Sequence, residues 1–114
     1  MRIGEVSRRS GVSARSLRYY EQHGLISARR ESNGYREYDD STVARAEIVH
    51  MLFGMDFPRE VVQSVLTCTG DAPAAAHDAL ADQLVQVRSE LAERIERLAY
   101  THGRVNAFLE ERGR

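Results

Sequence analysis

The longest uninterrupted feature of the sequence is the stretch from Ala74 to about Glu111, which contains no proline and a single glycine, Gly103. Apolar side chains, joined by one histidine, recur in this stretch at steps of three and four residues, which is the spacing of one face of an α-helix. At 1.5 Å per residue, a helix of roughly 36 residues is about 54 Å long. The recurring positions, which we call the seam, are Leu80, Leu84, Val87, Leu91, Ile95, Leu98, His102, Val105 and Leu109.

The seam predicts self-association, because the remaining helices of a 114-residue chain are too short to cover it. The extra four-residue step between Leu91 and Ile95 is a stutter, which locally relaxes a supercoil. His102 is a polar residue of the kind that sets helix register. We therefore expect a homodimer that pairs through this helix. A long helix that folds back on itself at Gly103 is the alternative.

The charge distribution separates a basic head from an acidic remainder. Residues 1–38 hold 8 arginines and 4 acidic residues, a net charge of +4, whereas residues 39–114 hold 8 arginines and 13 acidic residues, a net charge of −5. Such asymmetry is typical of a head that meets a polyanion. We expect a DNA-binding domain over 1–70 and a dimerisation helix over 71–114, with the break at residues 70–73.

The first residues predict two short helices, about 3–10 and 14–23, around the tight turn 11–13. Gly11 can adopt a positive φ and end the first helix, and the Ser13 hydroxyl can accept an N–H at the start of the second. Gly24 ends the second helix. A helix, a short turn with glycine and a second helix form the helix-turn-helix pattern.

A small β-hairpin, or wing, is predicted next, because Asn33-Gly34 is a strong two-residue turn signal. We expect Arg36 on one face of the wing and Tyr35 and Tyr38 together on the other. Residues 39–42 offer capping side chains for a third helix that runs to about Met55. Pro58 then starts a fourth helix, to about Thr69.

Several short motifs in this region resemble the MerR family of bacterial transcription regulators, from residue 3 to about 66. They are Ile3-Gly4-Glu5-Val6, Gly11-Val12-Ser13, Leu17-Arg18-Tyr19-Tyr20-Glu21, Gly24-Leu25-Ile26 and Gly34-Tyr35-Arg36-Glu37-Tyr38-Asp39. The resemblance implies a mostly α fold: a winged helix-turn-helix head and an antiparallel coiled coil of the two long helices. It also implies sequence-specific binding to a promoter with a long −35/−10 spacer, which the dimer bends and untwists for RNA polymerase.

The residues expected to contact DNA lie in the second helix and the wing. Short side chains at the start of that helix permit close approach, and Arg15 and Arg18 can reach phosphates or the guanine edge. The resemblance places Arg18 and Tyr19 on the DNA face. For Tyr20, a DNA contact and packing in the core both remain open. The full set is Ser13, Ala14, Arg15, Ser16, Arg18, Tyr19, Tyr20, Arg29, Arg30, Tyr35, Arg36 and Tyr38, with Arg36 and Tyr38 on phosphates and Tyr35 partly against the core.

An effector is harder to predict from the sequence. Metal-sensing and iron–sulfur relatives carry several cysteines, whereas this chain has one, Cys68, which we expect to be an inert buried thiol rather than a sensor. We expect no metal and no cofactor. A small-molecule effector of unknown identity near His77 and Asp78 is one reading, and a solvated first helical turn is the other.

Other classes of function are disfavoured. The sequence shows no nucleophile–base constellation and no glycine-rich phosphate loop, so we do not expect an enzyme. Neither a signal peptide nor a long apolar run is present, so we expect a cytoplasmic protein. Two alternatives remain: an architectural or excisionase-like DNA-bending protein that does not control RNA polymerase directly, and an interaction protein that recruits a partner through its coiled coil.

Overall fold

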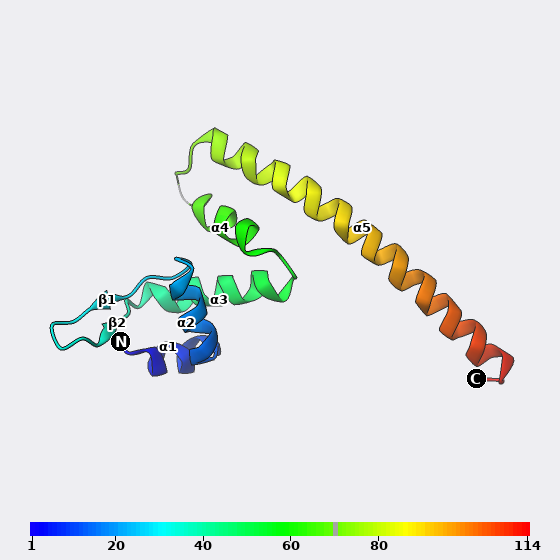
Figure 1. Ribbon diagram of the computed structural model, residues 1–114, viewed down its shortest axis with the longest axis horizontal. Helices are drawn as coiled ribbons and strands as arrows, with labels where there is room; N and C mark the ends of the chain where they lie inside the picture. The colour runs from blue at the N-terminus through cyan, green and yellow to red at the C-terminus, as the bar shows by residue number, and fades with distance from the viewer. Residues whose placement is uncertain (70) are drawn as a thin grey trace. The chain divides into compact units, whose positions relative to one another are not determined.

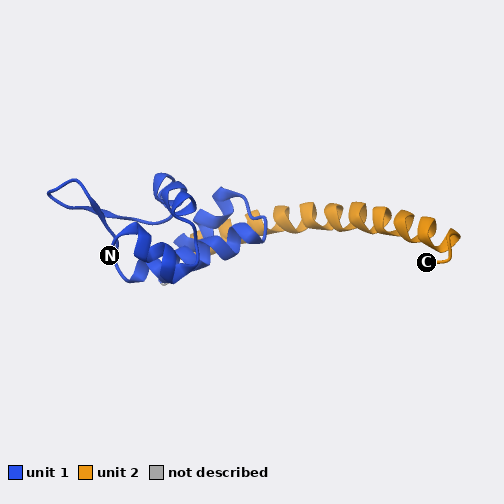
Figure 2. Ribbon diagram, turned by 90° about the horizontal axis from the view of Figure 1, so that it is seen from below, with its two compact units in different colours: residues 1–72 blue, residues 73–114 orange. Residues whose placement is uncertain are grey.

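A computed structural model of the protein describes residues 1–69 and 71–114. The described residues form α1 (Ile3–Ser10), α2 (Ala14–Gln22), β1 (Arg29–Arg30), β2 (Arg36–Glu37), α3 (Ser41–Gly54), α4 (Arg59–Thr67) and α5 (Ala74–Glu111), as Figure 1 shows. They divide into two compact units, 1–72 and 73–114 (Figure 2). The expected mostly helical fold, with one small hairpin and a long C-terminal helix, is confirmed.

The turn between α1 and α2 forms as the local sequence predicts. Gly11 has a φ of 74°, and its N–H donates to the Ser7 carbonyl at 2.9 Å. The Ser13 hydroxyl accepts the Ser16 N–H at 3.1 Å and so caps α2. Helix α2 ends at Gln22, before Gly24 with a φ of 71°. Local chemistry therefore determines the start and the direction of α2.

The core of the first unit draws side chains from α1 to α4 and from the segments between them. Leu17 of α2 and Val6 of α1 are fully buried, and Leu25 and Ile26 fill the space after α2. The remaining members of this core are Val12, Tyr20, Tyr38, Ala46, Val49, Leu52, Val62 and Leu66. Burial of one such aliphatic side chain contributes about 1.5–3 kcal/mol, so this unit has its own apolar core.

The wing is an antiparallel hairpin in which Arg29 pairs with Glu37 and Arg30 pairs with Arg36. Its turn is longer than the expected two-residue Asn33-Gly34 turn. The Glu31 N–H donates to the Tyr35 carbonyl at 2.8 Å, and the Gly34 N–H donates to the Glu31 carbonyl at 2.9 Å. Gly34 takes a φ of 86° at the end of a three-residue loop, a conformation that glycine adopts without strain.

The two wing tyrosines do not share a face, so the expectation that they lie together is wrong. Tyr35 is 61% exposed, whereas Tyr38 is 2% exposed and belongs to the core. Residues three apart in an extended chain point to opposite sides, which accounts for the difference. The Tyr38 N–H also donates to the Met1 carbonyl at 2.7 Å, which ties the end of the wing to the start of the chain.

One helix cap and one helix end differ from expectation. Helix α3 starts after Asp40, which makes no side-chain capping bond among the described residues; backbone bonds such as Thr42 N–H to the Asp39 carbonyl, 3.0 Å, form its first turn. Helix α4 follows Pro58 as expected but ends at Thr67, with Cys68 as its C-cap. Of the expected break at 70–73, Gly70 lies outside the described residues.

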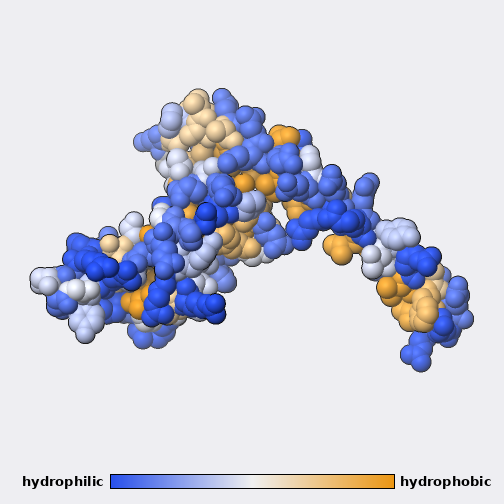
Figure 3. All heavy atoms as spheres, viewed as in Figure 1, coloured by the Kyte–Doolittle hydropathy of each residue, from blue (hydrophilic) through white to orange (hydrophobic). Residues whose placement is uncertain are grey.

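Helix α5 is a single helix of 38 residues that continues through Gly103, so the alternative of a fold-back at that glycine is wrong. All of its residues are described, and none is buried. Seam residues such as Ile95 and Leu98 are 65% and 67% exposed, and apolar surface is visible along the helix in Figure 3. Within the described part of the chain, no helix has both the length and the apolar character of a membrane span.

Candidate nucleic-acid interface

Helix α2 presents one polar, basic face and one apolar face. Arg15 and Arg18 are exposed, and Tyr19 is 40% exposed, whereas Leu17 is fully buried beneath them. Ala14 and Ser16 are half-buried at the start of the helix, beside the exposed capping Ser13. Short side chains followed by long hydrogen-bond donors suit the close approach of a helix to a DNA groove.

Tyr20 belongs to the core, so its expected place on the DNA face is corrected. Its side chain is 4% exposed, and its ring stacks on Phe53 with centroids 5.6 Å apart and planes 21° apart. The hydroxyl lies 3.3 Å from His50 Nδ1, and burial raises the pKa of Tyr20 above its ordinary value. Burial of the Tyr20 ring against Phe53 is more favourable than exposure of its hydroxyl to solvent, because the aromatic contact exists only in the core.

Tyr19 combines packing with exposure. Its ring lies 4.3 Å from the ring of His23 and 6.2 Å from that of Phe53, centroid to centroid. These contacts hold the ring against the protein while 40% of the residue stays accessible. A phenol held in this way can offer its hydroxyl to a phosphate without losing much conformational freedom.

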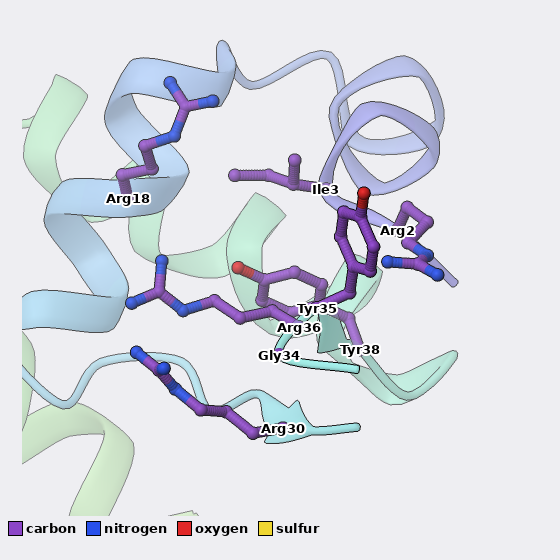
Figure 4. A pocket seen from close by; sticks show the side chains of 8 residues that line it. All are labelled: Arg2, Ile3, Arg18, Arg30, Gly34, Tyr35, Arg36 and Tyr38. Carbon is purple, nitrogen blue, oxygen red and sulfur yellow. The ribbon is translucent and has the colours of Figure 1, made fainter. Parts of the chain in front are cut away.

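Four arginines from four different places in the sequence meet around one open pocket of about 340 Å³ (Figure 4). Arg2 precedes α1, Arg18 comes from α2, and Arg30 and Arg36 come from the two strands of the wing. The pocket lining also includes Ile3, Gly34, Tyr35 and Tyr38. A concave site with four guanidinium groups favours anions with several oxygens, such as a phosphate.

The tyrosines of the wing organise this pocket in different ways. The Arg2 guanidinium lies 4.2 Å from the centre of the exposed Tyr35 ring, a cation–π contact that Figure 4 shows beside the pocket. Tyr38 lies beneath; it is 2% exposed and its hydroxyl donates to Glu21 Oε1, so the structure does not support the expected direct contact with a phosphate. Tyr35 was expected to pack partly against the core, but it lies at the surface instead.

The carboxylate of Glu21 lies within this basic region. Its Oε2 forms an ion pair with Arg36 Nε at 3.0 Å, and its Oε1 accepts the Tyr38 hydroxyl at 3.3 Å. Burial first, and then the negative charge and hydrogen bond of Glu21, raise the pKa of Tyr38 above its ordinary value. Glu21 thus links the last turn of α2 to the wing.

The structure gathers some of the predicted residues and separates others. Arg18, Arg30 and Arg36 share the pocket, whereas Arg15 and Tyr19 lie elsewhere on α2 and do not line it. Arg29 stands opposite Glu37 in the hairpin. Sequence reasoning missed Arg2 and Glu21. Both lie within or next to the motifs, but only the folded chain shows that they meet the wing.

Among the described residues, no three histidine, cysteine, aspartate or glutamate side chains are grouped as a metal site would require. Cys68 is half-buried at the end of α4, and His77 and Asp78 are exposed in the first turns of α5. The four-arginine pocket is therefore the candidate anion site of the first unit.

The sequence and the fold are similar to those of known proteins. Residues 1–67 match the MerR HTH family regulatory proteins. The chain is 37% identical over 78 residues to the HTH-type transcriptional regulator HmrR of Rhizobium leguminosarum bv. viciae. This match covers 68% of this chain and 60% of HmrR. It is 38% identical over 96 residues to heavy metal-dependent transcription regulator 2 of Rhizobium meliloti, which covers 83% of this chain and 65% of that protein.

A similar solved structure is that of a MerR family transcriptional regulator from Listeria monocytogenes, with a TM-score of 0.66 and 28% identity over 93% of this chain and 80% of that one. The chain spans less than two thirds of the length of HmrR and of the Rhizobium meliloti regulator. The match nevertheless includes the whole of α1, α2, the wing, α3 and α4. The chain therefore belongs to the MerR family of helix-turn-helix, DNA-binding transcription regulators.

Proposed function

We propose that the protein acts as a homodimer on a specific inverted-repeat site within a promoter, where it bends and untwists a long −35/−10 spacer so that RNA polymerase can use both elements. One observation carries this proposal. The exposed face of α2 and the four-arginine pocket lie in the same compact unit, so one head offers both a groove-reading helix and a phosphate-binding surface.

The two parts of the head have different tasks in this proposal. Arg15 and Arg18 of α2 reach base edges or phosphates in the major groove, where a bidentate arginine recognises guanine. Arg30 and Arg36 of the wing neutralise phosphates, which positions the head without reading sequence. Residues 1–70 form the DNA-binding domain and residues 71–114 the dimerisation helix.

The exposed seam of α5 supports the homodimer. Leu91, Ile95 and Leu98 are 38%, 65% and 67% exposed in the single chain, and a second copy of α5 is the partner of matching length and pattern. In the proposed dimer the two α5 helices pack antiparallel through the seam. Two joined heads bind two half-sites with far higher affinity than one, because the second contact becomes intramolecular.

Control by an effector completes the proposal. A small molecule that binds the dimer and favours one of its two DNA-bound shapes would switch the promoter, and its free energy of coupling equals its difference in affinity for those shapes. One relative is named a heavy metal-dependent transcription regulator, so metal ions should be tested as effectors together with small organic molecules.

A footprint on the DNA upstream of the gene for this protein tests the proposal. We expect protection of a near-palindromic site between the two promoter elements, hypersensitive cleavage at its centre where the DNA is distorted, and altered transcription by RNA polymerase in the same reaction. The experiment is repeated with divalent metal ions and candidate small molecules. Equal affinity for a scrambled duplex, with no effect on transcription, would show an architectural DNA-bending protein instead.

A further inference from the structure

Glu21 is the carboxylate that joins α2 to the wing at the edge of the four-arginine pocket. Its side chain is 16% exposed, lies 3.0 Å from Arg36 Nε and accepts the Tyr38 hydroxyl at 3.3 Å. Tyr38 in turn is buried in the core. The carboxylate therefore has one oxygen directed to a fixed core residue and the other to a half-exposed arginine.

The wing needs such an anchor for two physical reasons. Its strands are two residues long, and an isolated hairpin of that size is barely stable in water. Arg30 and Arg36 also stand directly opposite each other across the two strands, and like charges in that position repel. With Arg2 and Arg18 at the same pocket, the repulsion drives Arg36 away from α2 unless a negative charge offsets it.

We propose that Glu21 is a positioning residue for DNA binding, which holds the Arg36 side chain beside α2 so that wing and recognition helix meet the DNA backbone as one surface. Glu21 acts through Arg36 and does not itself contact DNA. The inference rests on the proposed phosphate contact of Arg36. Tyr38 fixes the carboxylate, and the carboxylate fixes the arginine.

The opposite account is that Glu21 only adds a negative charge near the phosphates. In that case, its removal would strengthen DNA binding, because carboxylate and phosphate repel each other. The positioning role predicts that its removal weakens binding, and only while Arg36 is present. The two accounts thus differ in the sign of the effect and in its dependence on Arg36.

A double-mutant cycle with Glu21→Gln and Arg36→Ala separates them. A random-sequence DNA duplex is a sufficient probe, since phosphate contacts form on any sequence, and affinity is measured by fluorescence anisotropy over a series of salt concentrations. We expect Glu21→Gln to weaken binding by about threefold to tenfold. Arg36→Ala should weaken binding and make the slope of log affinity against log salt shallower by about 0.9.

In the Arg36→Ala background, Glu21→Gln should then have no further effect. Glu5→Gln is the matched control, because Glu5 pairs with Arg9 at 3.1 Å on α1 and does not line the pocket. This control should leave affinity unchanged. Tyr38→Phe removes the hydroxyl that orients Glu21 but keeps the carboxylate, so it should weaken binding in the same direction by a smaller factor.

Three results would overturn the inference. Tighter binding by Glu21→Gln would show that the carboxylate acts by its own charge. Equal weakening in the native and Arg36→Ala backgrounds would show a general loss of structure. An unchanged affinity and salt slope in Arg36→Ala would remove the contact on which the inference rests, while the footprint of the native protein would still stand as evidence for the proposed regulator.

Discussion

The two units of this chain differ in how far they bury their apolar side chains. In residues 1–72, Val6, Leu17 and Leu25 are completely buried among helices of the same chain. In residues 73–114, helix α5 has no buried residue over its full described length, although apolar residues recur along its seam. The first unit, which we call the head, thus buries its apolar side chains, whereas the long helix leaves its apolar side chains exposed.

This difference separates two kinds of stability. Burial within the chain stabilises the head at any protein concentration, whereas a seam that is covered by a second copy contributes only when the copies associate. Helix α5 also lacks a side-chain cap at Pro73 among the described contacts, so its tertiary stabilisation would come from pairing in the proposed dimer. Substitutions in the two units should therefore differ in how they depend on concentration.

The largest effect is expected at the centre of the seam. Leu91→Asp places a carboxylate where two α5 helices are proposed to meet, and a buried unpaired charge is very unfavourable. We expect the dissociation constant of the dimer to rise more than about 100-fold and binding to the promoter site to be lost with it. Sedimentation equilibrium and a gel-shift titration measure the two effects on the same samples.

Ser89→Asp is the matched control for the seam, because residue 89 is exposed and lies two positions before Leu91 on the opposite side of the helix. It adds the same charge and should leave both the dimer and the DNA affinity intact. A Leu91→Asp protein that remains dimeric would break the comparison, since α5 would then not depend on its seam.

A smaller effect is expected from the core of the head. Leu17→Ala leaves a cavity beneath α2 and should lower the free energy of unfolding by about 2–5 kcal/mol. This loss should be the same at low and high protein concentration, as followed by urea denaturation with circular dichroism. A loss that grew on dilution would mean that the head, too, depends on the dimer.

The helices could be predicted closely because their signals are local. Gly11 and Ser13 determine the turn and the start of α2 through bonds to residues within four positions. The length of α5 follows from the absence of proline between Ala74 and Glu111. Where a cap was wrong, as at Asp40, backbone bonds had replaced the expected side-chain cap.

The interface was less predictable because it depends on contacts between distant residues. Nothing near Tyr35 and Tyr38 shows which one is buried, since the choice follows from Met1 and Glu21, which pack against Tyr38 from elsewhere in the chain. Arg2 reaches the wing in the same way. Alternation along a two-residue strand is too short a pattern to decide such questions.

The local cap of α2 provides a third test of the contrast between the units. Ser13→Ala removes the hydroxyl that accepts the Ser16 N–H, and the loss of such a cap costs about 1 kcal/mol. Ser89→Ala removes the same atoms from the exposed face of α5 and should change the free energy of unfolding by less than about 0.5 kcal/mol. Urea denaturation at one protein concentration compares them, and equal losses would contradict the role of the cap.

The smallest effect concerns the pH dependence that Tyr38 gives to the head. Its pKa is raised above the ordinary value of about 10, so the neutral phenol is favoured in the folded state. The resulting stabilisation is complete below about pH 10 and is lost as the pH rises through the higher folded-state pKa. The chain contains no lysine, which would otherwise titrate in the same range.

Tyr38→Phe should therefore make the free energy of unfolding fall less steeply as the pH rises above about 10, as measured by urea denaturation at each pH. Some dependence should remain, because burial also raises the pKa of Tyr20. Tyr100→Phe, at a 72% exposed ring on α5, is the control and should keep the native profile. If Tyr38→Phe also kept it, the Tyr38 hydroxyl would be solvated, and the head would enclose less of its wing than its burial indicates.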